Sequence, residues 1–186
     1  MWILILVVAF IVAYAAAAYN GFIALRNRAK NAWADIDVQL KRRHDLVPNL
    51  VTTVQGYASH EKSVFEDVAR LRSQAMGLEK LEDRGEAEAG FSGAIKSLFA
   101  VAEGYPALKA DQNFRNLQSQ LAEVEDHIQY ARRYYNAVVR DMNTKCEVFP
   151  SSIIAGMFSF GRLPYFQVEA DEQKPVMVDM GGGQTS

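Results

Sequence analysis

The histidines and acidic residues of this sequence are the first places to look for catalysis or metal binding. His60 and Glu61 are adjacent, as in the helix of zinc metalloproteases, but that motif needs a second histidine where the sequence has Val64. Glu123 and His127 share one helix face at a spacing of four, whereas di-iron bundles repeat a Glu-x-x-His spacing on two helices. We interpret Glu123 and His127 as an ordinary surface pair.

The remaining reactive side chains do not combine into a catalytic unit. Asp35 and Asp37 point in different directions on a helix and cannot act as an acid–base couple. His44 beside Asp45 is most simply a polar pair near a helix kink. Cys146 has no histidine near it in sequence, so we interpret it as a packed thiol rather than a nucleophile.

Other signatures of chemistry are also missing from the sequence. There is no Gly-x-Ser-x-Gly elbow, and residues 181–183 are three glycines without the Lys-Ser/Thr of a phosphate-binding loop. One cysteine cannot form an internal disulfide, and a net charge of -2 gives no general attraction to nucleic acid. We predict no catalytic, cofactor-binding or metal site, and no nucleic-acid partner.

The N-terminal segment predicts a membrane anchor. Residues 2–19 carry no charge, and the first charged side chain is Arg26. About 20 apolar residues in a helix cross a bilayer core of about 30 Å, so residues 1–21 are expected to be a retained transmembrane helix with residues 2–19 in the lipid. A cleaved signal peptide, with small residues at 15–17, and a buried core helix are the alternatives.

Two weaker signals lie in and after this anchor. Ala9, Ala13 and Ala17 share one face, a spacing that lets helices approach closely in lipid and hints at self-association. The basic residues between Arg26 and Lys30 favour a cytoplasmic position for the rest of the chain.

The strongest helical pattern covers residues 111–147, which contain neither proline nor glycine. Asp111 is expected to cap its start, and Pro150 stops it. Nine apolar residues recur at spacings of three and four, which predicts a long seam for helix packing. They are Phe114, Leu117, Leu121, Val124, Ile128, Ala131, Tyr135, Val138 and Met142.

Three more helices are predicted before it. A long helix over 22–58 is expected to bend near Pro48, which removes one backbone donor, with Asp45 as a possible cap for a restart. Shorter helices are predicted over 60–77 and 86–104.

The borders of these shorter helices come from caps and composition. Ser59 is the expected cap of the helix over 60–77. The charged stretch 79–88 is expected to be a solvated connection between the two.

The predicted fold class is all-α: a transmembrane helix followed by an elongated antiparallel bundle over 22–149, with two long and two shorter helices. The segment 150–186 is expected to hold apolar residues that pack on the bundle or on a neighbouring subunit, and then an extended tail over 169–186. The apolar residues are Ile153, Ile154, Met157, Phe158, Phe160, Tyr165, Phe166 and Val168.

The basic run from Lys41 to His44 has two interpretations. If the helix is straight, Arg42 lies about 35 Å beyond Tyr19, well outside the reach of lipid charge at physiological salt. The run is then a solvated face that pairs with acidic neighbours, or a docking site for another subunit. Arg132 to Tyr135 also mixes bases with aromatics, but Tyr135 belongs to the core seam, so this run does not predict nucleic-acid binding.

Several runs resemble the LemA family. They are Arg42 to Val51, with Asp45-Leu46-Val47-Pro48-Asn49-Leu50-Val51 as the specific part, then Val54, Gly56-Tyr57-Ala58, His60-Glu61, Tyr19-Asn20, Tyr135-Asn136 and Phe149-Pro150. The resemblance covers nearly the whole chain. It implies a bacterial inner-membrane protein with an N-terminal anchor, a helical domain and no established enzymatic activity. Some family members carry a lipoprotein cysteine before the Tyr-Asn pair, which implies an extracytoplasmic domain, so both membrane orientations stay open.

Three functions remain for such a chain. The first is a non-enzymatic, membrane-anchored scaffold that self-assembles, and a relative that acts in forming the magnetosome membrane favours membrane organisation. The second is a sensor or receptor with a pocket between helices, which would act through a separate, unidentified protein partner. The third is an enzyme that uses Asp35, Asp37, His44, His60 or Glu61.

Overall fold

The structure, a computed structural model, describes residues 1–78 and 81–166, and within them it contains helices and no strand. The described helices are α1 (Trp2–Gln55), α2 (Lys62–Met76), α3 (Leu81–Glu103), α4 (Pro106–Ala110), α5 (Gln112–Glu147) and α6 (Ser151–Met157). The predicted all-α fold, with two long and two shorter helices, is therefore confirmed. The short helices α4 and α6 were not predicted.

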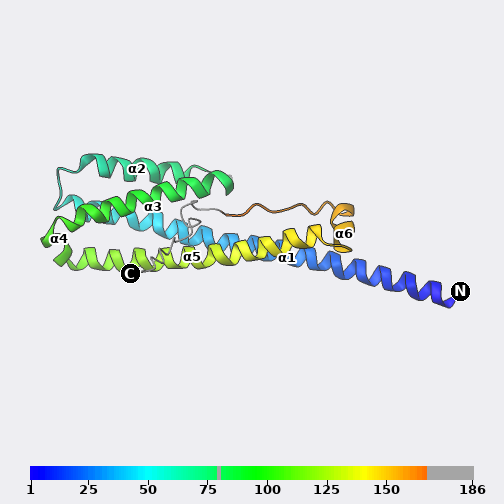
Figure 1. Ribbon diagram of the computed structural model, residues 1–186. Coiled ribbons are helices and arrows are strands. Elements are labelled where there is room, and N and C mark those ends of the chain that lie inside the picture. Colours follow the sequence, from blue (N-terminus) through cyan, green and yellow to red (C-terminus); the bar gives the residue numbers. More distant parts are fainter. Residues whose placement is uncertain (79–80, 167–186) are drawn as a thin grey trace, which may run out of the picture.

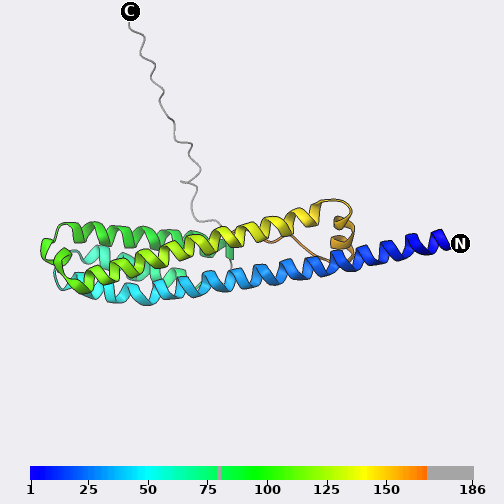
Figure 2. The ribbon, with the colours of Figure 1, turned by 90° about the horizontal axis from the view of Figure 1, so that it is seen from below.

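The helices form a rod with two parts, one built from four helices and one built from two (Figure 1). Antiparallel α1 and α5 run along its length, and the hairpin of α2 and α3 covers only the part farthest from the N-terminus (Figures 1 and 2). The four-helix part has its own core around Leu50, Phe91, Leu98 and Leu108. The two-helix part is sealed by the α1–α5 seam, in which Ala29, Ala32 and Ile36 face Val124, Ile128 and Tyr135.

The helix α1 passes through Pro48 without a break. A proline has no amide hydrogen, so the carbonyl of His44, one turn earlier, loses its helical donor. Arg72 of α2 supplies a replacement, because its Nε donates to the His44 carbonyl oxygen at 2.8 Å. Asp45 is exposed and begins no new helix. The long helix was predicted correctly, but the cap at Asp45 was wrong, since a side chain from another helix satisfies the backbone there.

Two predicted borders in the α2–α3 hairpin are also wrong. The residue at the N-terminus of α2 is Glu61 rather than Ser59, and its side chain makes no capping bond. The helix α3 begins at Leu81, so most of the charged stretch that we expected to be a solvated connection is helical. Its residue Glu88 is buried against α1, which explains why composition alone misplaced this border.

Asp111 connects the end of α1 to the start of α5 at the end of the rod farthest from the N-terminus. Its Oδ1 accepts a hydrogen bond from the amide of Phe114 at 2.9 Å, which is the predicted cap of α5. Its Oδ2 accepts a hydrogen bond from the hydroxyl of Tyr57 at 3.3 Å. The negative charge of Asp111 raises the pKa of Tyr57. One carboxylate thus ties the end of α1 to the start of α5.

The segment after α6 returns along the α1–α5 pair. Asn143 of α5 donates to the carbonyl of Leu163 at 3.0 Å and accepts from the amide of Leu163 at 2.8 Å. Asn136 makes the same pair of bonds with Phe166, at 3.1 and 2.9 Å. These side chains hold an extended backbone as a neighbouring strand would. The expected packing of apolar residues on the bundle is confirmed for Ile154, Phe160 and Phe166. The remaining described members of this set are exposed in the single chain: Ile153, Met157, Phe158 and Tyr165. Val168 and the expected extended tail lie outside the described residues.

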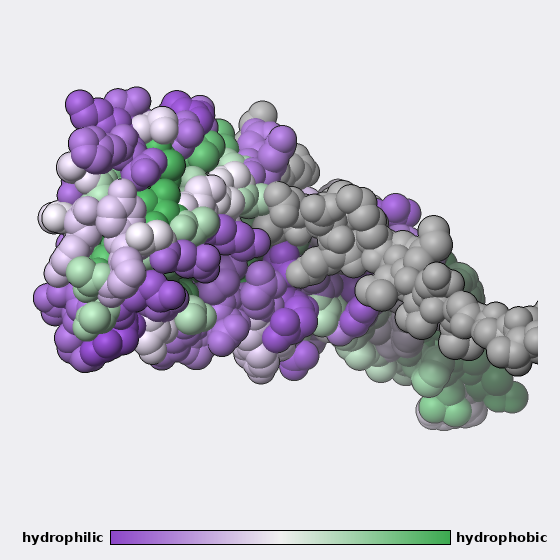
Figure 3. All heavy atoms as spheres, turned by 60° about the vertical axis from the view of Figure 1, so that its left-hand side comes forward, coloured by the Kyte–Doolittle hydropathy of each residue, from purple (hydrophilic) through white to green (hydrophobic). Residues whose placement is uncertain are grey.

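The first part of α1 projects beyond the bundle. By length and composition, α1 is the one helix in the described residues that could cross a membrane. Residues 2–14 are exposed, and burial begins at Ala18. A buried core helix would be covered by its own chain, so this alternative does not hold. Figure 3 shows hydrophobic colour gathered on the receding end of the rod, where α1 leaves the bundle.

Candidate functional site

A buried ionic cluster joins α1 to α3 in the middle of the rod. Arg43 of α1 forms an ion pair with Glu88 of α3, and the other oxygen of Glu88 lies 2.9 Å from Nε2 of His44. These three side chains are at most 4% exposed. Arg43 also donates to the hydroxyl of Ser92 and, at 2.9 Å, to a carboxylate oxygen of Glu125 on α5. Arg43 therefore connects three helices.

An aromatic ring closes this cluster on one side. The ring of Phe91 stacks on His44 with centroids 4.8 Å apart and an angle of 4° between the planes. The guanidinium of Arg43 lies over the same ring, with Cζ 5.5 Å from its centroid. Two nitrogen atoms of the cluster, Nε of Arg43 and Nδ1 of His44, have no hydrogen-bond partner in the structure.

The environment of Glu88 favours its charged form. Burial raises the pKa of this carboxyl, but the hydrogen bonds from His44 and Arg43 and the positive charges of these two side chains together outweigh burial. The pKa of Glu88 therefore lies below its ordinary value. A charged carboxylate inside the bundle is then matched by the Arg43 guanidinium, as a buried charge requires.

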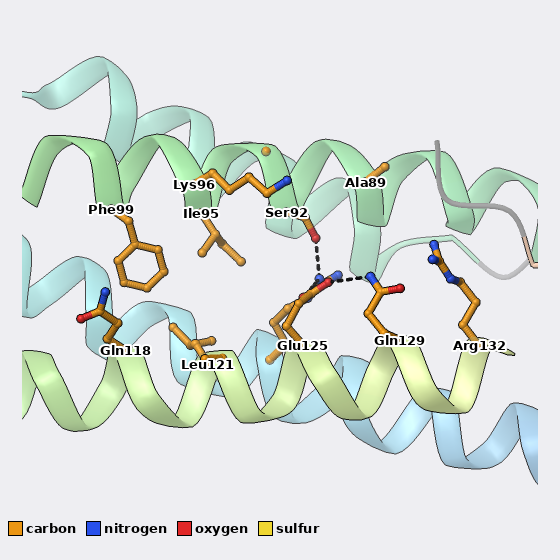
Figure 4. Close-up of a pocket in the computed structure, with 13 residues that line it drawn as sticks. Ala89, Ser92, Ile95, Lys96, Phe99, Gln118, Leu121, Glu125, Gln129 and Arg132 are labelled. Carbon is orange, nitrogen blue, oxygen red and sulfur yellow. Dashed lines mark hydrogen bonds and ion pairs between the residues drawn. The ribbon is translucent and has the colours of Figure 1, made fainter. Parts of the chain in front are cut away.

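A cleft of about 520 Å³ opens beside this cluster, between α3 and α5. Ile95, Phe99 and Leu121 line its apolar end, while Ser92, Glu125 and Gln129 gather at its polar end (Figure 4). Arg43 of α1 also lines the cleft and donates to Ser92 and Glu125 at the polar end. The cleft thus has the mixed lining of a small-molecule site, with a few polar groups at one end of an apolar surface.

The basic run from Lys41 to His44 is half exposed and half buried in the structure. Lys41 and Arg42 are exposed, whereas Arg43 and His44 are buried. The expectation of a solvated face, or of a docking face formed by the whole run, is therefore wrong for Arg43 and His44. His44 pairs with Glu88 rather than with its neighbour Asp45, and it lies in a continuous helix rather than beside a break.

The other reactive residues singled out in the sequence are scattered. His60 is exposed between α1 and α2. Asp37 pairs with Arg84 of α3, whereas Asp35 and His127 line a second, smaller depression of about 260 Å³. The expected surface pair of His127 with Glu123 is confirmed at 3.6 Å.

The single thiol is partly covered, as predicted. Cys146 lies 3.7 Å from the carbonyl oxygen of Phe160, and burial raises the pKa of the Cys146 thiol. No three His, Cys, Asp or Glu side chains lie close enough to hold a metal ion among residues 1–78 and 81–166.

The buried cluster was missed by the sequence analysis. Arg43 and His44 were singled out, but Glu88 was assigned to a solvated stretch. One signal was available: Glu88, Phe91 and Ile95 are spaced by three and four, so Glu88 extends the apolar face of α3. A charged residue on an apolar face calls for a buried partner of opposite charge.

In its described part the chain is a helical-bundle protein without strands, and its first helix is apolar and long enough to cross a membrane. The LemA family pattern matches residues 32–180, so the chain belongs to the LemA family. Two magnetosome proteins of Paramagnetospirillum magneticum, MamQ 1 and MamQ 2, are each 26% identical over 86% of this chain and 68% of their own length. Protein LemA of Metamycoplasma hominis is 23% identical over 81% of this chain and 69% of its own length.

Proposed function

We propose that this protein is a non-enzymatic scaffold that is anchored in the bacterial inner membrane by a single span and assembles with copies of itself. One observation carries the proposal: α1 is a single helix from Trp2 to Gln55, and it is both the exposed apolar span and the spine of the bundle. Because no hinge separates the two parts, the bundle is held as a rigid rod at a fixed direction to its anchor.

Three further observations support a scaffold. Among the reactive residues named from the sequence, only His44 is buried, and it pairs with Glu88, whose other carboxylate oxygen is held by Arg43. The apolar faces of Ala9 and Ala13 remain exposed in the single chain, as a self-associating span requires. The relatives named as magnetosome proteins support a role in membrane organisation.

The mass of the full-length protein tests this proposal. After extraction in a mild detergent, native mass spectrometry should give a homo-oligomer, with a protein mass that is a multiple of 20.8 kDa. The variant Ala9→Phe/Ala13→Phe should shift the population toward the monomer, because bulky side chains hold the helices apart.

The control places the same side chain on another face of the span. The variant Val7→Phe/Ile11→Phe keeps two phenylalanines in the lipid but leaves the alanine face unchanged. Equal dissociation of both variants would show that bulk in the lipid, rather than the alanine face, disturbs assembly. A strictly monomeric parent protein at every concentration would overturn the proposal of self-assembly.

The cleft between α3 and α5 favours a second function, a sensor that binds a small molecule. Its volume of about 520 Å³ suits a compact ligand with an apolar body and one polar end. Arg43 links this cleft to Glu88 and His44, so a ligand that contacts Arg43 could alter the connection between α1 and α3. A sensor of this kind would act through a separate protein partner.

A cleft-filling variant separates the two functions. Native mass spectrometry of protein purified from its own membranes should show an added small-molecule mass that disappears in Leu121→Trp. The control is Tyr130→Trp, on the exposed surface of the same helix. The same spectrum for parent and Leu121→Trp, with no added mass, would leave the scaffold and remove the sensor.

A further inference from the structure

The end of the bundle nearest the apolar part of α1 is covered by α6 and the turn that follows it (Figure 1). Ile154 and Ala155 of α6 pack on Ala18 and Phe22 of α1. The ring of Phe158 lies 4.8 Å from that of Tyr19, centroid to centroid. These contacts fix the height of α6 along α1 at the residues where the helix enters the bundle.

The outer surface of this region is apolar and uncovered. Phe149 is 81% exposed and Met157 is 71% exposed, and three more large apolar side chains between residues 148 and 158 are exposed. We name this surface the collar, which consists of Val148, Phe149, Ile153, Met157 and Phe158. Grouped apolar side chains on an otherwise polar rod indicate a surface that meets something other than water.

The position of the collar along α1 indicates which part of the surroundings the collar contacts. From Trp2 to Tyr19 the helix rises about 25 Å, which is nearly the thickness of a bilayer core of about 30 Å. When this stretch lies in lipid, Tyr19 is at the boundary between hydrocarbon and headgroups, where tyrosine and tryptophan are enriched. Phe158 touches Tyr19, so the collar lies at the same depth.

The charged residues around the collar suit this boundary. Lys145 passes beside Gly21, which has no side chain to obstruct it, and places its Nζ 4.9 Å from the centroid of the Phe22 ring. Arg26 lies over the ring of Phe160 at 5.8 Å. Arg162 is largely exposed and pairs with Glu147 at 3.2 Å. Basic side chains with apolar stems of this kind reach from hydrocarbon to headgroups.

We infer that α6 and the collar lie in the interfacial layer of the same bilayer that α1 spans, as a second membrane contact that does not cross it. The inference rests on the anchoring that forms part of the proposed function. Apolar area, depth and surrounding charge agree on the lipid boundary, whereas a second copy of the chain would have to cover the collar within the headgroup layer. A bundle held at two points would stand at a fixed tilt to the membrane.

Depth-resolved fluorescence on the full chain tests this inference. In a Cys146→Ser background, an environment-sensitive nitrobenzoxadiazole probe is attached at Met157→Cys, and the protein is reconstituted in vesicles of phosphatidylethanolamine and phosphatidylglycerol. The probe should emit at shorter wavelength than in water and lose most of its fluorescence to a nitroxide placed near the lipid ester groups. Ile153→Cys is a second collar position that should behave in the same way.

Two reference positions make the outcomes separable. Phe10→Cys, in the middle of the span, should be quenched best by a nitroxide deep in the acyl chains. Met76→Cys replaces another exposed methionine, at the end of α2 and roughly 25–30 Å farther from the lipid, and should not be quenched.

Each pattern of quenching and emission supports or overturns a different part of the inference. Quenching at Phe10→Cys without quenching at the collar positions overturns this inference and leaves the anchor intact. A collar probe that emits at short wavelength but is not quenched by lipid nitroxide shows a second copy on the collar and also overturns it. No quenching at Phe10→Cys overturns the anchor and this inference together.

Discussion

Arg72 donates a hydrogen bond of 2.8 Å from Nε to the main-chain carbonyl of His44, the carbonyl that Pro48 leaves without a helical donor. A proline inside a helix normally costs a hydrogen bond and introduces a steric clash. Here a side chain of α2 replaces the missing donor, so that the break in the hydrogen-bond ladder of α1 becomes a point of attachment for the α2–α3 hairpin.

The variant Arg72→Met should lower the free energy of unfolding by about 1–3 kcal/mol, because it leaves a partly buried carbonyl without a partner. Chemical denaturation of the detergent-solubilised protein measures this change. The matched control is Arg70→Met, which removes only an exposed pair with Asp67 and should change stability by less than about 1 kcal/mol.

A double-mutant cycle checks the cause of this effect. In Pro48→Ala the restored amide can donate to the His44 carbonyl, so Arg72→Met should cost less in that background than in the parent chain. Equal costs in the two backgrounds would show that Arg72 stabilises the fold by some contact other than this carbonyl.

The variant Glu88→Gln should destabilise the protein by about 3 kcal/mol, because it leaves the buried guanidinium of Arg43 with only the partly exposed Glu125 as a charged partner. Thermal unfolding followed by circular dichroism measures the loss. Glu86→Gln, two residues earlier on the exposed face of α3, should change stability by no more than about 0.5 kcal/mol. Equal effects of the two variants would contradict the buried pair.

Stability should fall in acid because of Glu88. Its pKa in the folded protein is below the ordinary value of 4.5, so the unfolded chain binds the proton more readily. The stability that Glu88 contributes is therefore complete above about pH 4.5 and is lost as pH falls through its lower folded pKa. Denaturation of the parent and of Glu88→Gln between pH 7 and 3 should show their difference shrinking in acid, and a constant difference would contradict this assignment.

The variant Asn143→Ala should release the segment that follows α6. It removes both hydrogen bonds to Leu163, each worth about 1 kcal/mol, so amide exchange over residues 159–166 should accelerate about tenfold or more. Hydrogen–deuterium exchange measures this directly. Asn113→Ala, at an exposed position near the start of α5, should leave exchange in this segment unchanged.

Much of the architecture could be predicted because it depends on local pattern. Apolar residues at spacings of three and four fixed the face of α5 that is buried, and Asp111 capped this helix as expected. The long uncharged stretch after Trp2 indicated a span by its length alone. Each of these features depends only on residues that are close together in sequence.

The candidate site could not be predicted in the same way. Whether the carboxylate of Glu88 faces water or a guanidinium depends on how α3 packs on α1, and composition classed its segment as solvated. The helix α6 could not be predicted either, because it is too short to show a helical period in the sequence. Nor could the path of the segment that Asn136 and Asn143 bind, because it depends on contacts with a distant part of α5.

By itself, then, the sequence determined an uncharged span and long amphipathic helices, because hydrophobic period and length act along one chain segment at a time. The run from Asp45 to Val51 separately indicated the LemA family. Only the tertiary structure decided which polar groups are buried together. The partners of Arg43, of the His44 carbonyl and of Leu163 come from 20 to 82 positions away in sequence, and their pairing is set by the packing of whole helices.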